Sequence, residues 1–182
     1  MPYFGFIEGH SHLDRKQLSI IKELIGSESP SVVAKFEEEF AKIVGNGECI
    51  SYAAGRMGFY DLMKFLDIGF GDEVILPGST CSVMANAILR TGATPIYADI
   101  DPETFGSSAS ATASCITDAT KIIVAQHSFG IPCDIHSIQS LAQSRGIFLF
   151  EDCALTLGSS VDGLVVGNFG DAALFSTDHT KP

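Results

Sequence analysis

Two adjacent carboxylic acids, Glu151 and Asp152, follow the apolar run 147–150. A carboxylate at the end of a buried strand is costly to desolvate unless it has a partner, so Asp152 could pair with a cationic group of a ligand, such as a protonated pyridine nitrogen. The alternative is structural: Asp152 caps the following segment, and Glu151 is solvated. Taken alone, the motif favours the structural alternative.

A turn of small residues occupies 51–58, between a short strand predicted at 49–51 and a helical run at 59–66. Small residues at a strand-to-helix turn let backbone amides approach an anion, and the N-terminus of the helix favours its charge. Gly55 lies in this turn, and Arg56 could contact a phosphate or face solvent. A tight turn without any ligand explains the same residues equally well.

The polar segment that follows a strand predicted near residue 172 contains Ser176 and Lys181, the only lysine among the last 60 residues. An isolated lysine is ordinarily a solvated surface charge. A Schiff-base lysine needs a partly desolvated site beside other cofactor contacts. Ser176 could bind a phosphate, so the two residues are candidates only in combination.

His127 follows another predicted strand and could either line a ligand pocket or be a buried structural histidine. The sequence contains no HExxH, GxSxG or P-loop pattern, which leaves metalloprotease, esterase and NTPase chemistry without support. The five cysteines are far apart and form no CxxC pair, which argues against a disulfide scaffold and against a zinc site. We therefore expect no metal and a reducing, cytoplasmic environment.

Short apolar runs alternate with stretches of helical period, a pattern that predicts an α/β fold with a mostly parallel sheet flanked by helices. The predicted strands are 74–76, 95–98, 122–125 and 147–150, and the predicted helices are 14–25, 32–44, 82–89 and 134–144, with a loop leading into a weak helix at 105–114. Such sheets bind ligands at the carboxyl ends of their strands, where His127 and Asp152 lie. The two N-terminal helices are expected to flank the sheet.

Composition excludes several classes of protein. Hydrophobic residues make up 46% of the 182 residues and charged residues 18%, as in a globular protein. The formal net charge is −11 with scattered basic residues, which excludes the electrostatic footprint of a nucleic-acid binder. Neither an export signal nor a membrane-spanning run is evident, so no membrane partner is expected.

Several segments, taken in order, resemble the DegT/DnrJ/EryC1/StrS aminotransferase family. They are 71–77, 92–95 with 99–102, 127–130, 151–154 and 175–181, and 167–171 also resembles the glycine-bounded strand that precedes the family's cofactor lysine. The resemblance spans nearly the whole chain but only the first half of a typical member. It implies an N-terminal segment with a helix at 1–25, and at 26–182 a partial large cofactor-binding domain that ends just after Lys181.

The resemblance also implies a function. Members have the fold of type I pyridoxal-phosphate enzymes, form dimers with active sites at the interface, and transfer an amino group, generally from glutamate, to a nucleotide-linked keto sugar in polysaccharide or glycoside biosynthesis. Lys181 would hold pyridoxal 5'-phosphate as a Schiff base and move protons, and Asp152 would keep the pyridine nitrogen protonated. Gly55, Arg56 and Ser176 would hold the phosphate.

Three positions depart from the family pattern. Arg56 replaces a common threonine, Cys81 stands where an aromatic residue usually covers the cofactor ring, and Leu155 replaces a glutamine that contacts the phenolic oxygen. Two alternatives therefore stay open. One is a pyridoxal-phosphate sugar dehydratase, against which Lys181 argues because such relatives have histidine there. The other is an inactive fragment or degenerate paralogue that binds a ligand or a partner.

Overall fold

The computed structural model describes residues 15–24, 30–45 and 47–177. The helices among them are α1 (Arg15–Leu24), α2 (Pro30–Val44), α3 (Gly55–Phe65), α4 (Ser82–Thr91), α5 (Ala109–Cys115) and α6 (Ile135–Arg145). The strands are β1 (Glu73–Pro77), β2 (Thr94–Ala98), β3 (Thr120–Gln126), β4 (Phe148–Asp152), β5 (Ser160–Val161), β6 (Leu164–Val165) and β7 (Ala172–Leu174). Lys181 lies outside the described residues.

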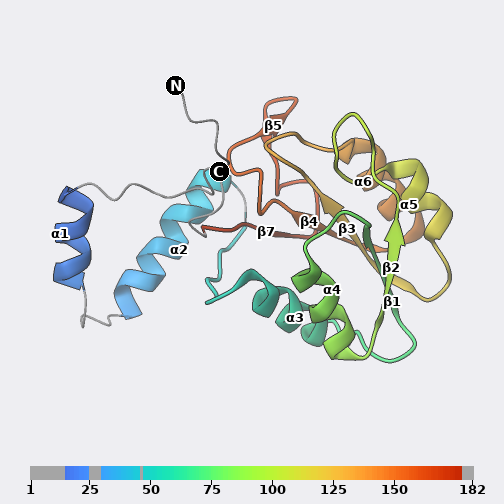
Figure 1. The fold of residues 1–182 in the computed structure, drawn as a ribbon, viewed down its shortest axis with the longest axis horizontal. Coiled ribbons are helices and arrows are strands. Elements are labelled where there is room, and N and C mark those ends of the chain that lie inside the picture. The colour runs from blue at the N-terminus through green and yellow to red at the C-terminus, as the bar shows by residue number, and fades with distance from the viewer. Residues whose placement is uncertain (1–14, 25–29, 46, 178–182) are drawn as a thin grey trace, which may run out of the picture.

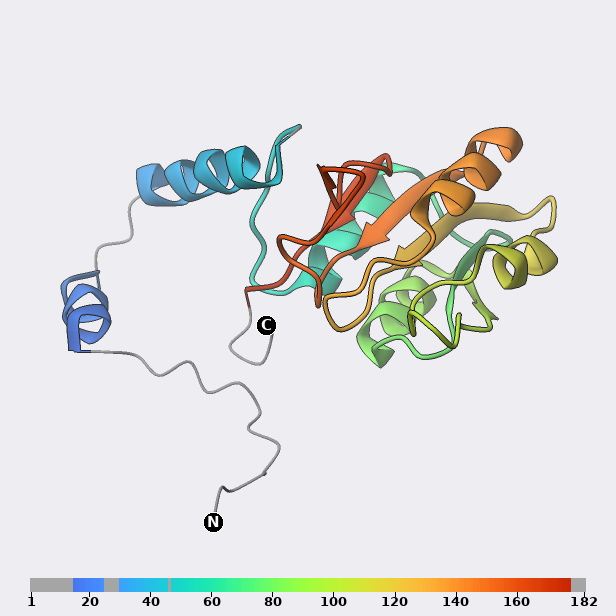
Figure 2. The ribbon, with the colours of Figure 1, turned by 90° about the horizontal axis from the view of Figure 1, so that it is seen from above.

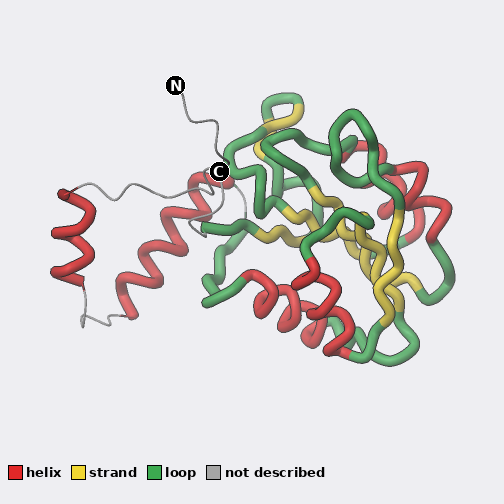
Figure 3. The backbone as a smooth tube through the Cα atoms, in the orientation of Figure 1, coloured by secondary structure: helices red, strands yellow, loops and turns green. Residues whose placement is uncertain are grey.

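A five-stranded sheet in the order β2-β1-β3-β4-β7 forms the centre of the molecule (Figure 3). All four strand pairs are parallel, which confirms the predicted sheet. The hairpin β5-β6 is separate and antiparallel. Because the strands run in the same direction, the segments that leave their carboxyl ends meet at one edge of the sheet.

Helices cover both faces of the sheet (Figure 1). Phe59 and Met63 of α3 pack with α4 against one face, which includes Val124 and Phe150. On the other face, α6 packs against a set that includes Leu149, one residue of β1 and alternate residues of β3. Successive side chains of a strand point to opposite faces, so the near-continuous apolar strands supply both cores.

The helix boundaries follow from local chemistry that the sequence shows. The Asp134 side chain accepts a hydrogen bond from the N–H of Ser137 at the start of α6, as expected of an N-cap residue. Gly92 and Gly146 end α4 and α6 in the left-handed conformation, with φ of 94° and 63°. These helices lie within two residues of their predicted bounds.

Two predicted strands are wrong. Residues 49–51 are irregular, because the backbone N–H of Ser51 donates to the Glu37 carboxylate (2.6 Å) and no described strand pairs with this segment. Residues 167–171 form turns and bends, because three of their backbone N–H groups donate to Glu151. In both segments a glutamate side chain takes the hydrogen bonds that a sheet would need.

The N-terminal helices do not flank the sheet as expected. Figure 2 shows α1 and α2 standing apart from it. The end of α2 contacts the body through buried Val44, whose carbonyl accepts a hydrogen bond from Asn168, and through an edge-on ring contact between Phe40 and Phe175. In the described part of the chain, no helix is long and apolar enough to cross a membrane.

Candidate functional site

The carboxyl edge of the sheet gathers most of the candidate residues. Asp152 is the last residue of β4, and it lies in register with Gln126 of β3 on one side and Leu174 of β7 on the other. Ser176 follows β7 by two residues and is half-buried. The sheet therefore brings Asp152 and the start of the 175–177 segment to the same edge.

Asp152 is only 6% exposed. Its Oδ1 accepts a hydrogen bond from the N–H of Ala154 (3.0 Å), so the expected local cap is present, but the carboxylate is also buried. Because Phe150 packs on the face that α3 and α4 cover, Asp152, two residues further along β4, belongs to the same face. A buried carboxylate on this face has the chemistry to bind a cationic ring nitrogen.

The N-terminus of α3 lies beside β7. A side chain built on Gly55, the first residue of α3, would meet Leu174 Cδ1 at 2.8 Å, so the absence of a side chain lets β7 approach the helix. Ala54 supplies no side-chain cap, although its carbonyl accepts a hydrogen bond from the N–H of Met57 (2.9 Å). The N–H groups of Gly55 and Arg56, which precede Met57, point out of the helix end and need acceptors from outside the helix. Arg56 is exposed on this turn. An anion is the partner that such a terminus favours.

Cys81 occupies a different part of the same edge. It is exposed and precedes α4, at the end of the loop that leaves β1. Since β3 separates β1 from β4, the strand that leads to Cys81 lies about 10 Å from the strand that ends at Asp152, at the usual strand spacing. Two buried threonine hydroxyls, those of Thr80 and Thr156, lack a hydrogen-bond partner among the described residues. Thr80 is the neighbour of Cys81, and neither threonine was identified from the sequence. No spacing or motif in the sequence marks either threonine.

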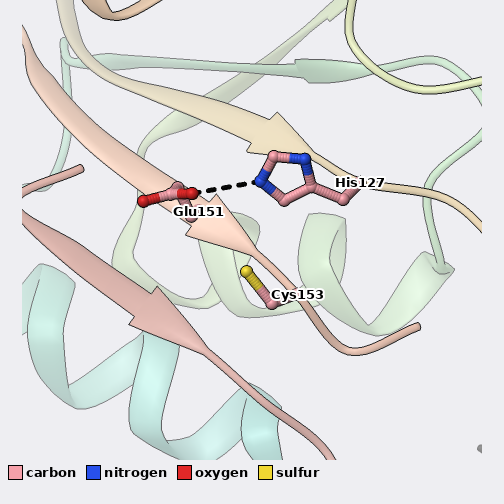
Figure 4. A group of neighbouring side chains, drawn as sticks. All are labelled: His127, Glu151 and Cys153. Carbon is pink, nitrogen blue, oxygen red and sulfur yellow. Dashed lines mark hydrogen bonds and ion pairs between the residues drawn. The ribbon is translucent and has the colours of Figure 1, made fainter. Parts of the chain in front are cut away.

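His127 and Glu151 form a buried structural pair. Both side chains are 0% exposed, and His127 Nε2 lies 3.1 Å from Glu151 Oε2 (Figure 4). The N–H of Cys133 donates to His127 Nδ1 (3.1 Å), which assigns the ring proton to Nε2. Of the two alternatives for His127, a pocket residue or a buried structural histidine, the structure favours the second. The expectation of a solvated Glu151 is wrong, because four donors compensate its burial.

The Glu151 carboxylate is ionised. Burial alone would raise its pKa, but hydrogen bonds from His127 and from Gly167, Gly170 and Phe169 outweigh burial and hold the pKa below its ordinary value. Burial and the neighbouring Glu151 charge raise the pKa of Cys133 to about 12 and also raise that of Cys153. Both thiols are therefore protonated at neutral pH.

His127, Glu151 and Cys153 converge in Figure 4, with potential ligand atoms within 4.8 Å of one another. Their chemistry does not suit a metal. The carboxylate oxygens already accept four hydrogen bonds, His127 Nδ1 accepts another, and the Cys153 thiol keeps its proton. A cation would have to displace these donors.

Comparison with known proteins extends over nearly the whole chain. The model of the DegT/DnrJ/EryC1/StrS aminotransferase family matches residues 19–182. GDP-perosamine synthase of Escherichia coli O157:H7 is 41% identical over 150 residues, which cover 82% of this chain and 41% of that enzyme. The chain therefore spans less than half the length of this curated relative.

Solved structures share the fold. The aminotransferase TlmJ of Streptoalloteichus hindustanus superposes with a TM-score of 0.86 at 34% identity, over 93% of this chain and 48% of that one. NtdA of Bacillus subtilis, solved with bound cofactor PMP, gives a TM-score of 0.81 at 26% identity, over 90% of this chain and 38% of that one. The expected α/β architecture is confirmed by both.

Proposed function

Since this chain belongs to the DegT/DnrJ/EryC1/StrS aminotransferase family, we propose that the protein is a pyridoxal-phosphate-dependent enzyme that transfers an amino group to a nucleotide-linked keto sugar. The cofactor agrees with the PMP bound to NtdA, and the substrate class agrees with the name of the GDP-perosamine synthase relative. Residues 26–182 are proposed as part of the large cofactor-binding domain, preceded by the segment 1–25.

The observation that carries the proposal is the buried Asp152 carboxylate near the N-terminus of α3, which has no side-chain cap. Leu174 connects the two, because it is in register with Asp152 and packs against Gly55. A cationic ring nitrogen and a phosphate are complementary to these two features. The residues present therefore fit pyridoxal phosphate.

Each residue then has a separate task. Asp152 holds a proton on the ring nitrogen, and the amides at Gly55 and Arg56, the guanidinium of Arg56 and the hydroxyl of Ser176 bind the phosphate. Lys181 would hold the cofactor covalently and would take a proton from, or return it to, the amino-bearing carbon of the substrate. The cofactor, when bound, supplies an electron sink for the bonds of the amino carbon.

We propose glutamate as the amino donor and a homodimer as the working form. Exposed apolar side chains on the N-terminal helices support the dimer, because a second subunit could bury them away from water. These side chains are Leu18, Ile20, Val32, Val33, Phe36 and Ile43. The cysteines of the described residues are free thiols, which supports a reducing cytoplasm. A role in polysaccharide biosynthesis agrees with the likeness to the spore coat polysaccharide biosynthesis protein SpsC of Bacillus subtilis, which is 37% identical over 149 residues.

A half-reaction tests this function. Full-length protein loaded with pyridoxal phosphate is mixed with glutamate, and 2-oxoglutarate is measured without any sugar present. We expect release of one 2-oxoglutarate per active site from the wild type and none from Lys181→Ala. Equal release by both proteins, or none by a loaded wild type, would reject glutamate-dependent transamination through Lys181.

A further inference from the structure

Glu151 lies next to Asp152 in sequence but belongs to the opposite face of β4, with Leu149. It is 0% exposed and cannot contact a ligand on the Asp152 face directly. Its two oxygens are fully used. Oε1 accepts from the N–H groups of Phe169 (2.7 Å) and Gly170 (2.6 Å), and Oε2 accepts from Gly167 (2.8 Å) and from His127 Nε2 (3.1 Å).

The three backbone donors belong to one loop, 167–170, which leads directly into β7. A side chain on Gly170 would meet the carbonyl oxygen of Leu149 at 2.7 Å, so the loop can approach β4 only without one. Gly167 has φ of 96°, a conformation that favours glycine, and a β-carbon there would clash with the Phe175 ring. The loop is therefore closely fitted to β4 on one side and to the residue after β7 on the other.

β7 itself is short, with three residues, and lies at one end of the five-stranded sheet. Its register with β4 pairs Glu151 with Ala173 and Asp152 with Leu174. Beyond the strand, the N–H of Cys153 donates to the carbonyl of Leu174 (2.8 Å). A strand with so few hydrogen bonds to its neighbour is held weakly, so we expect the loop that precedes β7 to help fix its position.

We propose that Glu151 is a positioning residue of the cofactor site, which fixes the 167–170 loop and thereby holds β7 and Ser176 beside Asp152. The inference rests on the proposed function for the identity of the ligand, but its structural half can be measured without a ligand. His127 completes the arrangement, because Cys133 fixes the ring so that Nε2 donates to Glu151.

The test compares Glu151→Gln with wild type in the full-length protein. Glutamine has nearly the same shape, but whichever way its amide turns, the NH₂ group faces two N–H donors. Glu73→Gln is the matched control, because Glu73 is a half-buried carboxylate on β1, bound to the Thr117 hydroxyl and distant from β7. Gly170→Ala is a second variant, which displaces the loop while leaving the carboxylate intact.

Two readouts are taken. Hydrogen exchange of the peptide covering 172–177 in the cofactor-free protein should be at least tenfold faster in Glu151→Gln and Gly170→Ala, and unchanged in Glu73→Gln. The apparent Kd for pyridoxal phosphate should rise at least tenfold in the same two variants, and the pH dependence of the visible absorbance of the bound cofactor should shift.

The positioning role is overturned if Glu151→Gln, folded by circular dichroism, matches wild type in exchange at 172–177 and in cofactor affinity. If Glu151→Gln does not fold, Gly170→Ala decides: unchanged exchange and affinity there would overturn the proposal. A wild type that binds no pyridoxal phosphate contradicts the proposed function instead. Exchange in the cofactor-free variants would then still decide whether Glu151 holds β7.

Discussion

Leu174 of β7 lies against Gly55 at the start of α3, with its Cδ1 at 2.8 Å and its Cδ2 at 3.1 Å from the position that a β-carbon would occupy. The same leucine is in register with Asp152. One side chain thus sets the distance between a helix N-terminus and a buried carboxylate. Any change that moves Leu174 should therefore shift both the N-terminus of α3 and the Asp152 carboxylate.

Gly55→Ala should weaken cofactor binding more than folding. Leu174 can rotate away from the new methyl group, so we expect a loss of unfolding free energy of only about 1 kcal/mol. The displaced leucine alters the site, and the apparent Kd for pyridoxal phosphate should rise about tenfold, equivalent to ~1.4 kcal/mol. Urea unfolding and an absorbance titration measure the two effects.

Gly78→Ala is the control for this substitution, because a side chain there has ordinary contact at 3.5 Å with the carbonyl of Ala98. It should change neither quantity. Truncating Leu174 in the Gly55→Ala background should relieve the overlap, so the two substitutions should be non-additive. Strict additivity would show that Leu174 does not transmit the effect.

Asp152→Asn should reduce cofactor affinity about 100-fold, because it removes a hydrogen bond between charged groups, and such a bond contributes ~1.5–3 kcal/mol to binding. Asp99→Asn is a matched control: Asp99 follows β2 at the same edge of the sheet but is exposed. Titration with pyridoxal phosphate, followed by absorbance, compares them. Equal loss in both variants would mean that general charge at this edge, and not Asp152, binds the ring.

Cysteine labelling should separate the thiols. Exposed Cys81 should react with iodoacetamide fastest, whereas Cys133, with its pKa raised to about 12 by burial, and Cys153, whose pKa burial also raises, should react only on unfolding. If Cys81 covers the cofactor ring, pyridoxal phosphate should slow its labelling. Mass spectrometry of the peptides reads out each site, and labelling of Cys81 that the cofactor leaves unchanged would remove it from the site.

Acid should destabilise the protein through Glu151. Its pKa is lowered in the folded state relative to the ordinary 4.5, so its contribution to stability is present above pH 4.5 and is lost as the pH falls below that value. Glu151→Gln should therefore be less stable than wild type at pH 7, and the difference should shrink toward pH 3. Urea midpoints across this range measure it, and a difference independent of pH would contradict an ionised Glu151.

The sequence predicts the elements of this fold well where local signals and burial agree. Short apolar runs between stretches of helical period indicate the parallel strands. Asp134, Gly92 and Gly146 mark helix ends that the structure confirms. It fails where a side chain from a distant segment takes the backbone hydrogen bonds. Glu37 at Ser51 and Glu151 at 167–170 are such cases, and neither long-range contact leaves a periodic signal.

The candidate site is predictable only in part. Asp152 and Gly55 are recognisable because strand ends and glycine turns are where this architecture binds ligands. Alternation along a strand predicts that adjacent Glu151 and Asp152 point to opposite faces, but the sequence does not show which of the two faces the site, since both are carboxylates after an apolar run. The buried hydroxyl of Thr80 is likewise visible only in three dimensions.

The most direct test of the account is the attachment point of the cofactor. Full-length protein incubated with pyridoxal phosphate is reduced with borohydride, digested and mapped by mass spectrometry. We expect the pyridoxyl-phosphate mass to be concentrated on Lys181 in wild type, with no such selective attachment to any lysine in Lys181→Ala or in denatured protein. Attachment spread over other lysines, or no attachment to Lys181 in a folded protein, would contradict it.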